Sequence, residues 1–303
     1  LKLIVRRENT KKILKKQTKS LIIRVIILAL ALTFLYLPIM TLIVYSFNES
    51  KMVTVWTQFS LKWYKALFNN SAIITAVGIS LTIAFMSAIA SVIIGTLAAF
   101  VMVRVHKFHG ESAFLLFMTA PMILPEVISG LALLLLFVTL GDIIPVFSDR
   151  GMITIWIAHV TFCSAYATVV IRSRFVELDV SIEEAAKDLG AGPLKVFFVI
   201  ILPAIMPAEV AAFLLSFTMS MDDLVITSFV AGPNSTTLPM LIFSSVRRGL
   251  SPEINALASV IVLVVSCFAF GSWVLTVRKQ KRKEKNQALI EAALRKETAR
   301  HTA

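Results

Sequence analysis

Three acidic side chains lie inside apolar stretches of this chain: Glu126, Asp222 and Asp223. Ionisable residues are costly inside a membrane-length apolar segment, and where they occur they usually serve binding or transport. Pro121 and Pro125 closely precede Glu126, so we expect the helix to be broken there, as helices often are at transport sites. Sparse carboxylates at a helix break are suited to binding a positively charged solute.

The two aspartates are adjacent, so on a helix their side chains would point about 100° apart. We therefore expect only one of Asp222 and Asp223 to face a solute pathway, while its neighbour caps a helix or pairs with a partner subunit. A purely structural role is the alternative for each of the three acids. His159 also lies in an apolar stretch, but a single His there is more often a satisfied packing residue.

The sequence contains no pattern for a metal site, a disulfide framework or nucleotide hydrolysis. Cys163 and Cys267 lie in apolar runs without a CxxC partner, and the four His residues lack metal-ligand spacing. No GxxxxGK[ST] segment occurs, so any ATP hydrolysis must take place on a separate chain. HExxH and GxSxG patterns are also missing, which argues against an intramembrane enzyme. No cofactor is predicted.

The composition indicates an integral membrane protein. Of the 303 residues, 57% are hydrophobic and 16% are charged, and the mean hydropathy is +0.84. A soluble domain has about 25% charged residues. No Asp, Glu, Lys or Arg occurs from Ser71 to Val103, a stretch longer than the about 20 residues needed to cross a bilayer.

The apolar runs predict an all-α protein with six transmembrane helices. The first run follows a basic stretch, as in a signal peptide, but it is too long and no A-x-A site follows, so we expect it to be retained. The last run is preceded by Ser251, Pro252 and Glu253, which suit a helix N-terminus. The predicted spans are approximately Ile22–Phe47, Ala72–Val103, Ala113–Leu140, Met152–Ile171, Ala204–Ala231 and Ile254–Val277.

The basic residues predict the orientation in the membrane. With the N-terminus inside, 24 of the 30 Lys and Arg residues fall on the cytoplasmic side, most of them in two tails, so both termini are predicted to be cytoplasmic. This distribution accounts for the net charge of +12 without a nucleic-acid partner. The tails, 1–20 and 278–303, flank a membrane domain at 21–277. The C-terminal tail is either a helix on anionic lipid or a frayed end. Glu209, just past Pro207, would be an interfacial residue near the cytoplasmic face.

The longest polar stretch of the interior, residues 172–203, joins the fourth and fifth spans on the predicted cytoplasmic side. Apolar residues recur there at helical spacing, which predicts a short amphipathic helix whose alanines allow close approach to a partner. Gly190 can end this helix in a left-handed conformation, and Pro193 prevents its continuation. An ordinary interfacial helix between two spans is the alternative. The apolar positions are Ile182, Ala185, Ala186 and Leu189.

The spacing within this loop matches, without a mismatch, the EAA motif of ABC importer permeases. The resemblance implies a type I ABC importer permease fold, and it implies that the loop couples the permease to a separate ATPase chain. Glu184 would then reach a basic residue across that interface. The matching positions are Glu184, Ala185, Ala186, Gly190, Ile200, Leu202 and Pro203.

A wider resemblance extends from about Tyr36 to about Trp273. Blocks such as APMILPEVISG and SFTMSMDDLVITSFVAGP resemble polyamine permeases of the spermidine/putrescine type, and most of all the putrescine-specific ones. The resemblance implies a multi-pass protein of the bacterial inner membrane that forms a heterodimer with a second permease subunit. It also implies two ATPase subunits and a periplasmic polyamine-binding protein as partners. The two tails depart from the pattern.

A polyamine consists of ammonium groups joined by short alkyl chains, so its path needs carboxylates and aromatic faces. Glu126 and the pair Asp222 and Asp223 would supply the carboxylates, and Trp63 in an outer loop would supply an aromatic face. Trp63 fits an interfacial aromatic belt equally well. The alternative function is an ion-coupled secondary transporter with Glu126 as a relay. The complete EAA motif and the lack of an evident inverted repeat argue against it.

Overall fold

The computed structural model describes residues 2–52, 55–105, 109–249 and 251–301. Residues 1, 302 and 303 of the predicted tails, and Lys107 of the orientation count, lie outside this described part. The regular elements within it are helices, apart from one isolated bridge between Asn48 and Phe59. The prediction of an all-α protein is therefore confirmed. The chain divides into two compact units, one formed by residues 1–69 with 250–303 and the other by residues 70–249.

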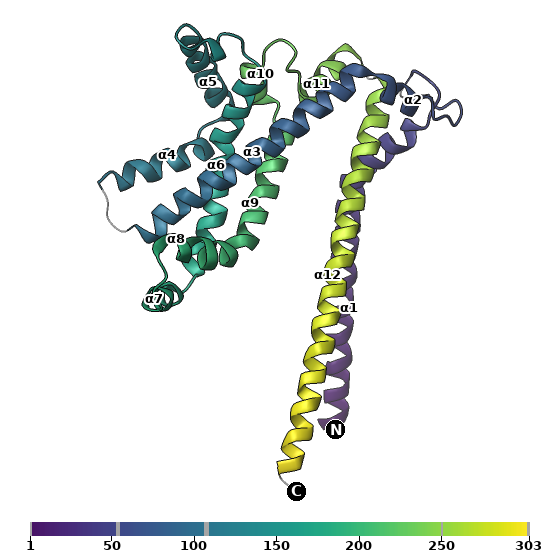
Figure 1. Ribbon diagram of the computed structural model, residues 1–303. Coiled ribbons are helices and arrows are strands. Elements are labelled where there is room, and N and C mark those ends of the chain that lie inside the picture. The colour runs from purple at the N-terminus through teal and green to yellow at the C-terminus, as the bar shows by residue number, and fades with distance from the viewer. Residues whose placement is uncertain (1, 53–54, 106–108, 250, 302–303) are drawn as a thin grey trace. The chain divides into compact units, whose positions relative to one another are not determined.

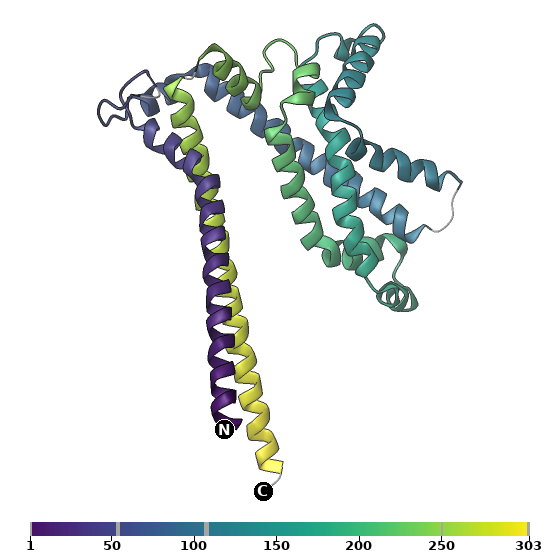
Figure 2. The same ribbon diagram turned by 180° about the vertical axis from the view of Figure 1, so that it is seen from behind.

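The unit formed by the two ends of the chain contains two long helices that lie side by side, α1 (Lys2–Ser46) and α12 (Pro252–His301) (Figures 1 and 2). The short helix α2 (Lys62–Asn69) packs against α12. The first predicted span lies within α1 except for its last residue, Phe47, and the last predicted span lies within α12, which begins at Pro252, as its start signals predict. Both helices continue into the basic tails, so the described part of the C-terminal tail is helical, and its contact with anionic lipid stays a prediction.

Apolar side chains on α1 are exposed along the segment Ser20–Tyr45, which is long and apolar enough to cross a membrane. Phe34, for example, is 81% exposed. The amphipathic pattern of a soluble helix would bury such residues against a core. This exposure agrees with a helix surrounded by lipid or by other membrane helices.

The second unit is built around three packed helices, α3 (Ser71–Arg104), α6 (Met152–Glu177) and α9 (Leu202–Asp222). The Asn70 side chain caps α3 by accepting from the amides of Ala72 and Ile73. The buried face of α3 consists largely of Ala, Ser and Gly, which let membrane helices approach closely. A Cβ atom at Gly95 would lie 2.9 Å from the backbone nitrogen of Thr168, so α3 and α6 are in backbone contact there.

The third predicted span is a broken pair of helices, α4 (Glu111–Ile123) and α5 (Glu126–Gly141), bent by 113°. The break falls at Leu124 and Pro125, directly before Glu126, which confirms the break expected from the prolines. A 3-10 turn, η1 (Pro145–Phe147), follows α5. Within the described chain, five helical segments could each cross a membrane, and the pair α4–α5 would make a sixth.

The predicted fifth span, Ala204–Ala231, is wrong at both ends. Between α6 and α9 lie α7 (Val180–Asp188), α8 (Pro193–Val196) and the π-helical turn η2 (Phe197–Ile201), and the membrane-length segment runs over Pro193–Asp222. Pro193 follows Gly192 in the first turn of α8, where proline is well tolerated, so it begins a helix rather than only ending one.

At the other end of this span the chain breaks after Asp222 and continues as α10 (Val225–Val230) and α11 (Leu238–Arg248). The side chain of Asp223 accepts hydrogen bonds from the amides of Ile226 and Thr227. These amides begin a new helix, because a side chain takes the place of their backbone acceptors. One aspartate of the pair, Asp223, therefore caps a helix, as we expected.

Candidate functional site

A cavity of about 480 Å³ lies where the two broken helices meet. The structure brings the three acids of the sequence prediction together in its wall, although they come from distant parts of the chain. The residues that line the cavity are Pro121, Met122, Leu124, Pro125, Glu126, Ser129, Phe162, Tyr166, Met219, Asp222, Asp223, Leu224, Val225 and Ile226.

Glu126 is the first residue of α5, and its side chain is exposed. The positive end of a helix dipole stabilises a carboxylate in the first turn. Among the residues that the structure describes, Glu126 forms no ion pair and no side-chain hydrogen bond. Its negative charge is therefore available to a ligand in the cavity.

The two aspartates have different surroundings. Asp222 is exposed at the end of α9 and forms no ion pair within the described chain. The Asp223 side chain is only 6% exposed, and it accepts hydrogen bonds from the Thr227 amide at 2.8 Å and the Thr227 hydroxyl at 2.6 Å. Asp223 therefore holds the break between α9 and α10, and Asp222 is the one whose charge is open to the cavity.

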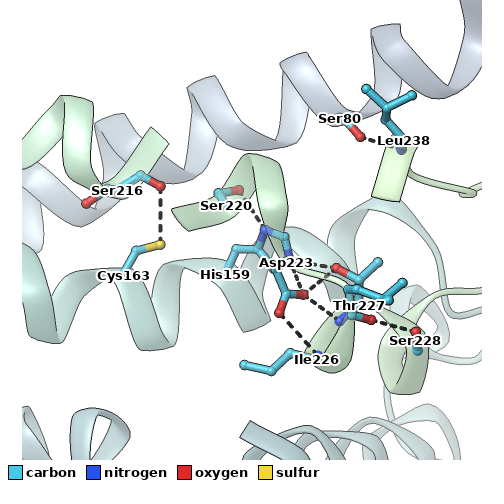
Figure 3. Close-up of polar contacts among 11 residues, drawn as sticks. Ser80, His159, Cys163, Ser216, Ser220, Asp223, Ile226, Thr227, Ser228 and Leu238 are labelled. Carbon is cyan, nitrogen blue, oxygen red and sulfur yellow. Dashed lines mark hydrogen bonds and ion pairs between the residues drawn. The ribbon is translucent and has the colours of Figure 1, made fainter. Parts of the chain in front are cut away.

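His159 of α6 completes the support of Asp223, as Figure 3 shows. This imidazole is 1% exposed, and its Nε2 atom lies 2.9 Å from the Thr227 hydroxyl and 3.3 Å from a carboxylate oxygen of Asp223. Because the Thr227 hydroxyl donates to Asp223, both neighbours of Nε2 act as acceptors, so Nε2 carries a hydrogen. The Nδ1 atom lies 2.6 Å from the hydroxyl of Ser220 on α9.

The prediction that His159 is a satisfied packing residue agrees with these contacts. It did not include the contacts of the ring with Ser220, Thr227 and Asp223, which hold the α9–α10 break. The imidazole joins α6 to both sides of the α9–α10 break. The sequence does carry a signal: Ser220, Asp223 and Thr227 follow one another at intervals of three and four residues, so they can turn toward one partner.

Trp63 is not among the residues that line the cavity. It belongs to α2 in the other unit, where it is 6% exposed and its indole nitrogen donates to the backbone oxygen of Asn48 at 2.7 Å. The aromatic faces in the cavity wall are those of Phe162 and Tyr166 on α6, which the sequence analysis missed. Their spacing of four residues places them on one helix face.

Glu209 lies apart from the cavity wall. Its carboxylate accepts a hydrogen bond of 3.2 Å from the Thr96 hydroxyl, so it joins α9 to α3. The side chain is half-buried. The prediction of an interfacial position stays a prediction, whereas this hydrogen bond gives Glu209 a structural partner.

The helix predicted in the loop 172–203 is α7, and both of its ends are capped. At the start, the Asp179 carboxylate accepts from the Ser181 amide at 2.9 Å, which lowers the pKa of Asp179. At the end, Gly190 has a φ of 82°, the left-handed conformation predicted for it. The amides of Gly190 and Ala191 bond to the carbonyls of Lys187 and Ala186, the pattern of a Schellman motif.

The apolar face of α7 is largely exposed. Ile182 is 48% and Leu189 is 89% exposed, and Ala185 and Glu184 are exposed as well. Ala186 instead packs against a buried cluster formed by residues of α3, α6, α8, η2 and α9, and the motif residue Leu202 packs against the same cluster. Pro203 follows in the first turn of α9 and is exposed, and Ile200 lies in η2.

The buried acid of α7 is Glu183, the neighbour of the motif residue Glu184. It is 5% exposed and forms an ion pair of 2.7 Å with Arg104 at the end of α3. The sequence analysis did not single out this pair. Two oppositely charged residues far apart in the sequence gave no signal of contact.

Comparison with known proteins identifies the family. The model of the family described as "Binding-protein-dependent transport system inner membrane component" matches residues 91–285. The chain is 58% identical over 260 residues to the putrescine transport system permease protein PotI of Escherichia coli K12, covering 86% of this chain and 92% of that protein. It is 39% identical over 248 residues to the spermidine/putrescine transport system permease protein PotC of the same strain, covering 82% and 91%.

A solved structure has the same fold. A bacterial ABC transporter involved in the import of the acidic polysaccharide alginate contains a chain that matches with a TM-score of 0.64 at 15% identity, covering 84% of this chain and 94% of that one. This likeness supports the predicted ABC importer permease fold and carries no information on the solute. Because the family match covers most of the sequence and the curated relatives align over more than four fifths of it, the chain belongs to the family of binding-protein-dependent transport system inner membrane components.

Proposed function

We propose that this chain is a permease subunit that carries a polyamine, putrescine in the first place, through the bacterial inner membrane into the cytoplasm. Membership of a binding-protein-dependent family supports an ATP-driven ABC importer over an ion-coupled transporter. The names of the relatives PotI and PotC support a polyamine as the solute. The structural observation that carries the proposal is the cavity with two open carboxylates, Glu126 and Asp222.

The chemistry of this cavity suits a flexible dication. Each carboxylate can accept hydrogen bonds from one ammonium group, and such charge-assisted bonds are stronger than neutral ones. Phe162 and Tyr166 offer ring faces to ammonium groups and to the methylene chain between them. The position of Asp222 in the cavity wall depends on the neighbouring Asp223, because the bonds of Asp223 to Thr227 fix where α9 ends.

The partners proposed for this chain are a second permease subunit in a heterodimer, two ATPase subunits, and a periplasmic polyamine-binding protein. The exposed apolar face of α7, with Leu189 89% exposed, supports a protein partner on this helix. Since the sequence has no P-loop, ATP must act through that partner. In the predicted orientation both termini and α7 lie in the cytoplasm, where an ATPase can reach them.

The test of the solute route is Glu126→Gln, which keeps the shape and hydrogen-bonding capacity of the side chain but removes its charge. In cells that produce the complete import system, uptake of labelled putrescine per assembled complex should fall about ten- to a hundredfold. Loss of a charged contact costs about 1.5–3 kcal/mol, and it acts on the rate if the contact is made at the barrier. Excess unlabelled spermidine in the wild type would measure the preference between the two polyamines.

Glu209→Gln is the matched control, because Glu209 is also an acid of a membrane segment but does not line the cavity. Its uptake per complex should stay near the wild-type value. If Glu126→Gln lowers only the amount of complex and leaves uptake per complex unchanged, Glu126 has a structural role and the proposed route is wrong.

The coupling role of α7 is tested separately by cysteines introduced one at a time from residue 182 to residue 190. Ala185→Cys should crosslink to the ATPase subunit because Ala185 is exposed, whereas Ala186→Cys should crosslink less because Ala186 packs against the buried cluster. Gly190→Pro should abolish uptake without preventing membrane insertion, because proline cannot adopt the positive φ of Gly190. Failure of every cysteine in this range to crosslink, with the ATPase present, would remove the assignment.

A further inference from the structure

The guanidinium group of Arg104 connects three helices of the second unit, α3, α6 and α7. Arg104, the last residue of α3, donates from Nε to Glu183 Oε1 at 2.8 Å, and its Nη2 atom lies 2.7 Å from the same oxygen. The Nη2 atom also donates to the backbone oxygen of Leu178, at the end of α6, at 3.2 Å. Glu183 lies in the first turn of α7.

This ion pair is well shielded from solvent. The side chain of Arg104 is 13% exposed and that of Glu183 is 6% exposed. Removing one partner from such a pair leaves the other charge without compensation, so the two residues hold each other firmly in place. Arg104 is suited to this position because its planar group can bond to a carboxylate and a carbonyl at the same time.

Apolar packing also connects α7 to α3 and α6. Ala186 of α7 and Ala191, just after it, pack against a buried cluster that includes Ala99 of α3 and Phe175 of α6. The helix α7 therefore touches the α3–α6 pair on one side and exposes Leu189 and Ile182 on the other. A force applied to the exposed side would reach α3 through both the cluster and the ion pair.

From α3 the contact continues toward the cavity. The face of α3 is made of small residues, and Gly95 meets the backbone of α6 so closely that a methyl group would not fit. Backbone contacts of this kind cannot be taken up by side-chain rearrangement, so we expect α3 and α6 to move together. The same α6 carries His159, Phe162 and Tyr166 at the cavity.

We propose that the Arg104–Glu183 ion pair is the joint that transmits movement of α7 to α3 and α6, so that both residues position the coupling helix relative to the transport cavity. The proposal rests on the proposed docking of an ATPase to α7 and adds the residues through which that docking acts. It predicts that breaking the pair separates ATP hydrolysis from transport. A pair needed only for folding would change the amount of complex and not this ratio.

The experiment uses Arg104→Gln, Glu183→Gln and the double variant, each in the complete import system purified and reconstituted in liposomes. The measurement is putrescine transported per ATP hydrolysed, in assembled complexes only. Each single variant should lower this ratio about 5- to 150-fold, the range of typical coupling free energies. The double variant should be no worse than the more severe single variant, because both remove the same contact.

The matched control is Glu177, an exposed acid that pairs with Arg174 at 2.9 Å within α6. Arg174 itself is left unchanged, because it also donates to the Ala204 carbonyl of α9 at 3.4 Å. Exposed pairs of this kind contribute little. Glu177→Gln should therefore leave the transport ratio unchanged.

A second measurement separates this inference from the coupling role of α7 itself. All variants carry Ala185→Cys, and crosslinking to the ATPase is measured in the otherwise unchanged protein first. Absence of the crosslink there contradicts the docking proposal. If the crosslink forms but Arg104→Gln and Glu183→Gln keep the normal transport ratio, or if they only fail to assemble, the ion pair is not a transmitting joint and the inference is overturned.

Discussion

The two helix breaks that border the cavity are held in different ways. At the α9–α10 break, the carboxylate of Asp223 is buried among Thr227, Ile226 and His159. At the α4–α5 break, the cap position is Pro125, no side chain caps α5, and Glu126 stays open within the described chain. The α9–α10 break is thus held by the side-chain contacts of Asp223, and we call it the fixed corner. The α4–α5 break has Pro125 at its cap position instead. The comparison shows that a membrane acid can support the backbone or face a solute, and that the contacts of its neighbours decide which.

The helices that follow the two breaks, α5 and α10, pack against each other. A Cβ atom added at Gly130 of α5 would lie 2.7 Å from a ring carbon of Phe229 and 3.3 Å from the Cα atom of Ile226. The open break is thus packed directly onto the fixed one. We expect changes at the fixed corner to affect the amount of folded protein and changes at the open acids to affect transport.

The largest effect on stability is expected from Asp223→Ala. This change leaves the Thr227 hydroxyl and the amides of Ile226 and Thr227 without their acceptor in a buried site, whereas the His159 Nε2–H group keeps the Thr227 oxygen. Each unsatisfied donor costs about 1–3 kcal/mol, so the loss should reach about 3 kcal/mol or more. Thermal unfolding of the detergent-solubilised complex measures it. Asp222→Ala is the control, and a loss as large as that of Asp223→Ala would contradict the difference between the two positions.

The next largest effect is expected on transport, from a change of Asp222, the aspartate whose side chain is exposed at the cavity. Asp222→Asn should lower putrescine uptake per assembled complex about ten- to a hundredfold, since it removes one charged contact with a dication. The melting temperature should stay close to that of the wild type. If Asp223→Asn lowers uptake per complex just as strongly while the complex remains fully assembled, the assignment of Asp222 as the residue open to solute is wrong.

A smaller effect is expected where the two breaks touch. Gly130→Ala places a methyl group against Phe229 and Ile226, and overpacking of this kind costs about 1–3 kcal/mol. The ring of Phe229 can move, so the value should fall in the lower part of that range. Gly78→Ala is the matched control in a helix, because its Cβ atom would meet nothing within 4 Å. It should be neutral or slightly stabilising, and an equal loss in both variants would exclude a contact effect.

The sequence predicted the helices and the break at Pro125 because these follow from hydropathy and from the geometry of proline, which are local. It also predicted that the adjacent aspartates differ, since a helix turns them apart. It could not predict which one is open, because that depends on His159, which lies more than sixty residues earlier in the chain. The C-terminal end of the fifth span was missed because the Asp223 cap interrupts a run that is otherwise apolar.

In the coupling loop, too, local features could be predicted from the sequence and long-range contacts could not. Gly190 and the apolar face of α7 were predictable from local spacing, and the caps at Asp179 and Gly190 agree with it. The role of Glu183 was not, because its partner Arg104 is far away in the sequence and both residues look like ordinary loop charges. The aromatic wall of Phe162 and Tyr166 was missed for a related reason: on α6 they are indistinguishable from lipid-facing or core residues until the neighbouring helices are placed.

The smallest effect is expected from Ser220→Ala, which removes one contact of the fixed corner and keeps the rest. The Ser220 hydroxyl lies 2.6 Å from Nδ1 of His159, whereas Nε2 keeps Thr227 and Asp223. Hydrogen bonds between membrane helices contribute about 0.6 kcal/mol on average and at most about 1.7 kcal/mol. The melting temperature of the complex should therefore fall less than in Asp223→Ala, with uptake per complex unchanged. Ser228→Ala serves as the control, because that exposed hydroxyl donates to the Leu224 carbonyl at the start of its own helix. A loss in Ser220→Ala as large as in Asp223→Ala would mean that His159, rather than the caps on α10, carries most of the support for the corner.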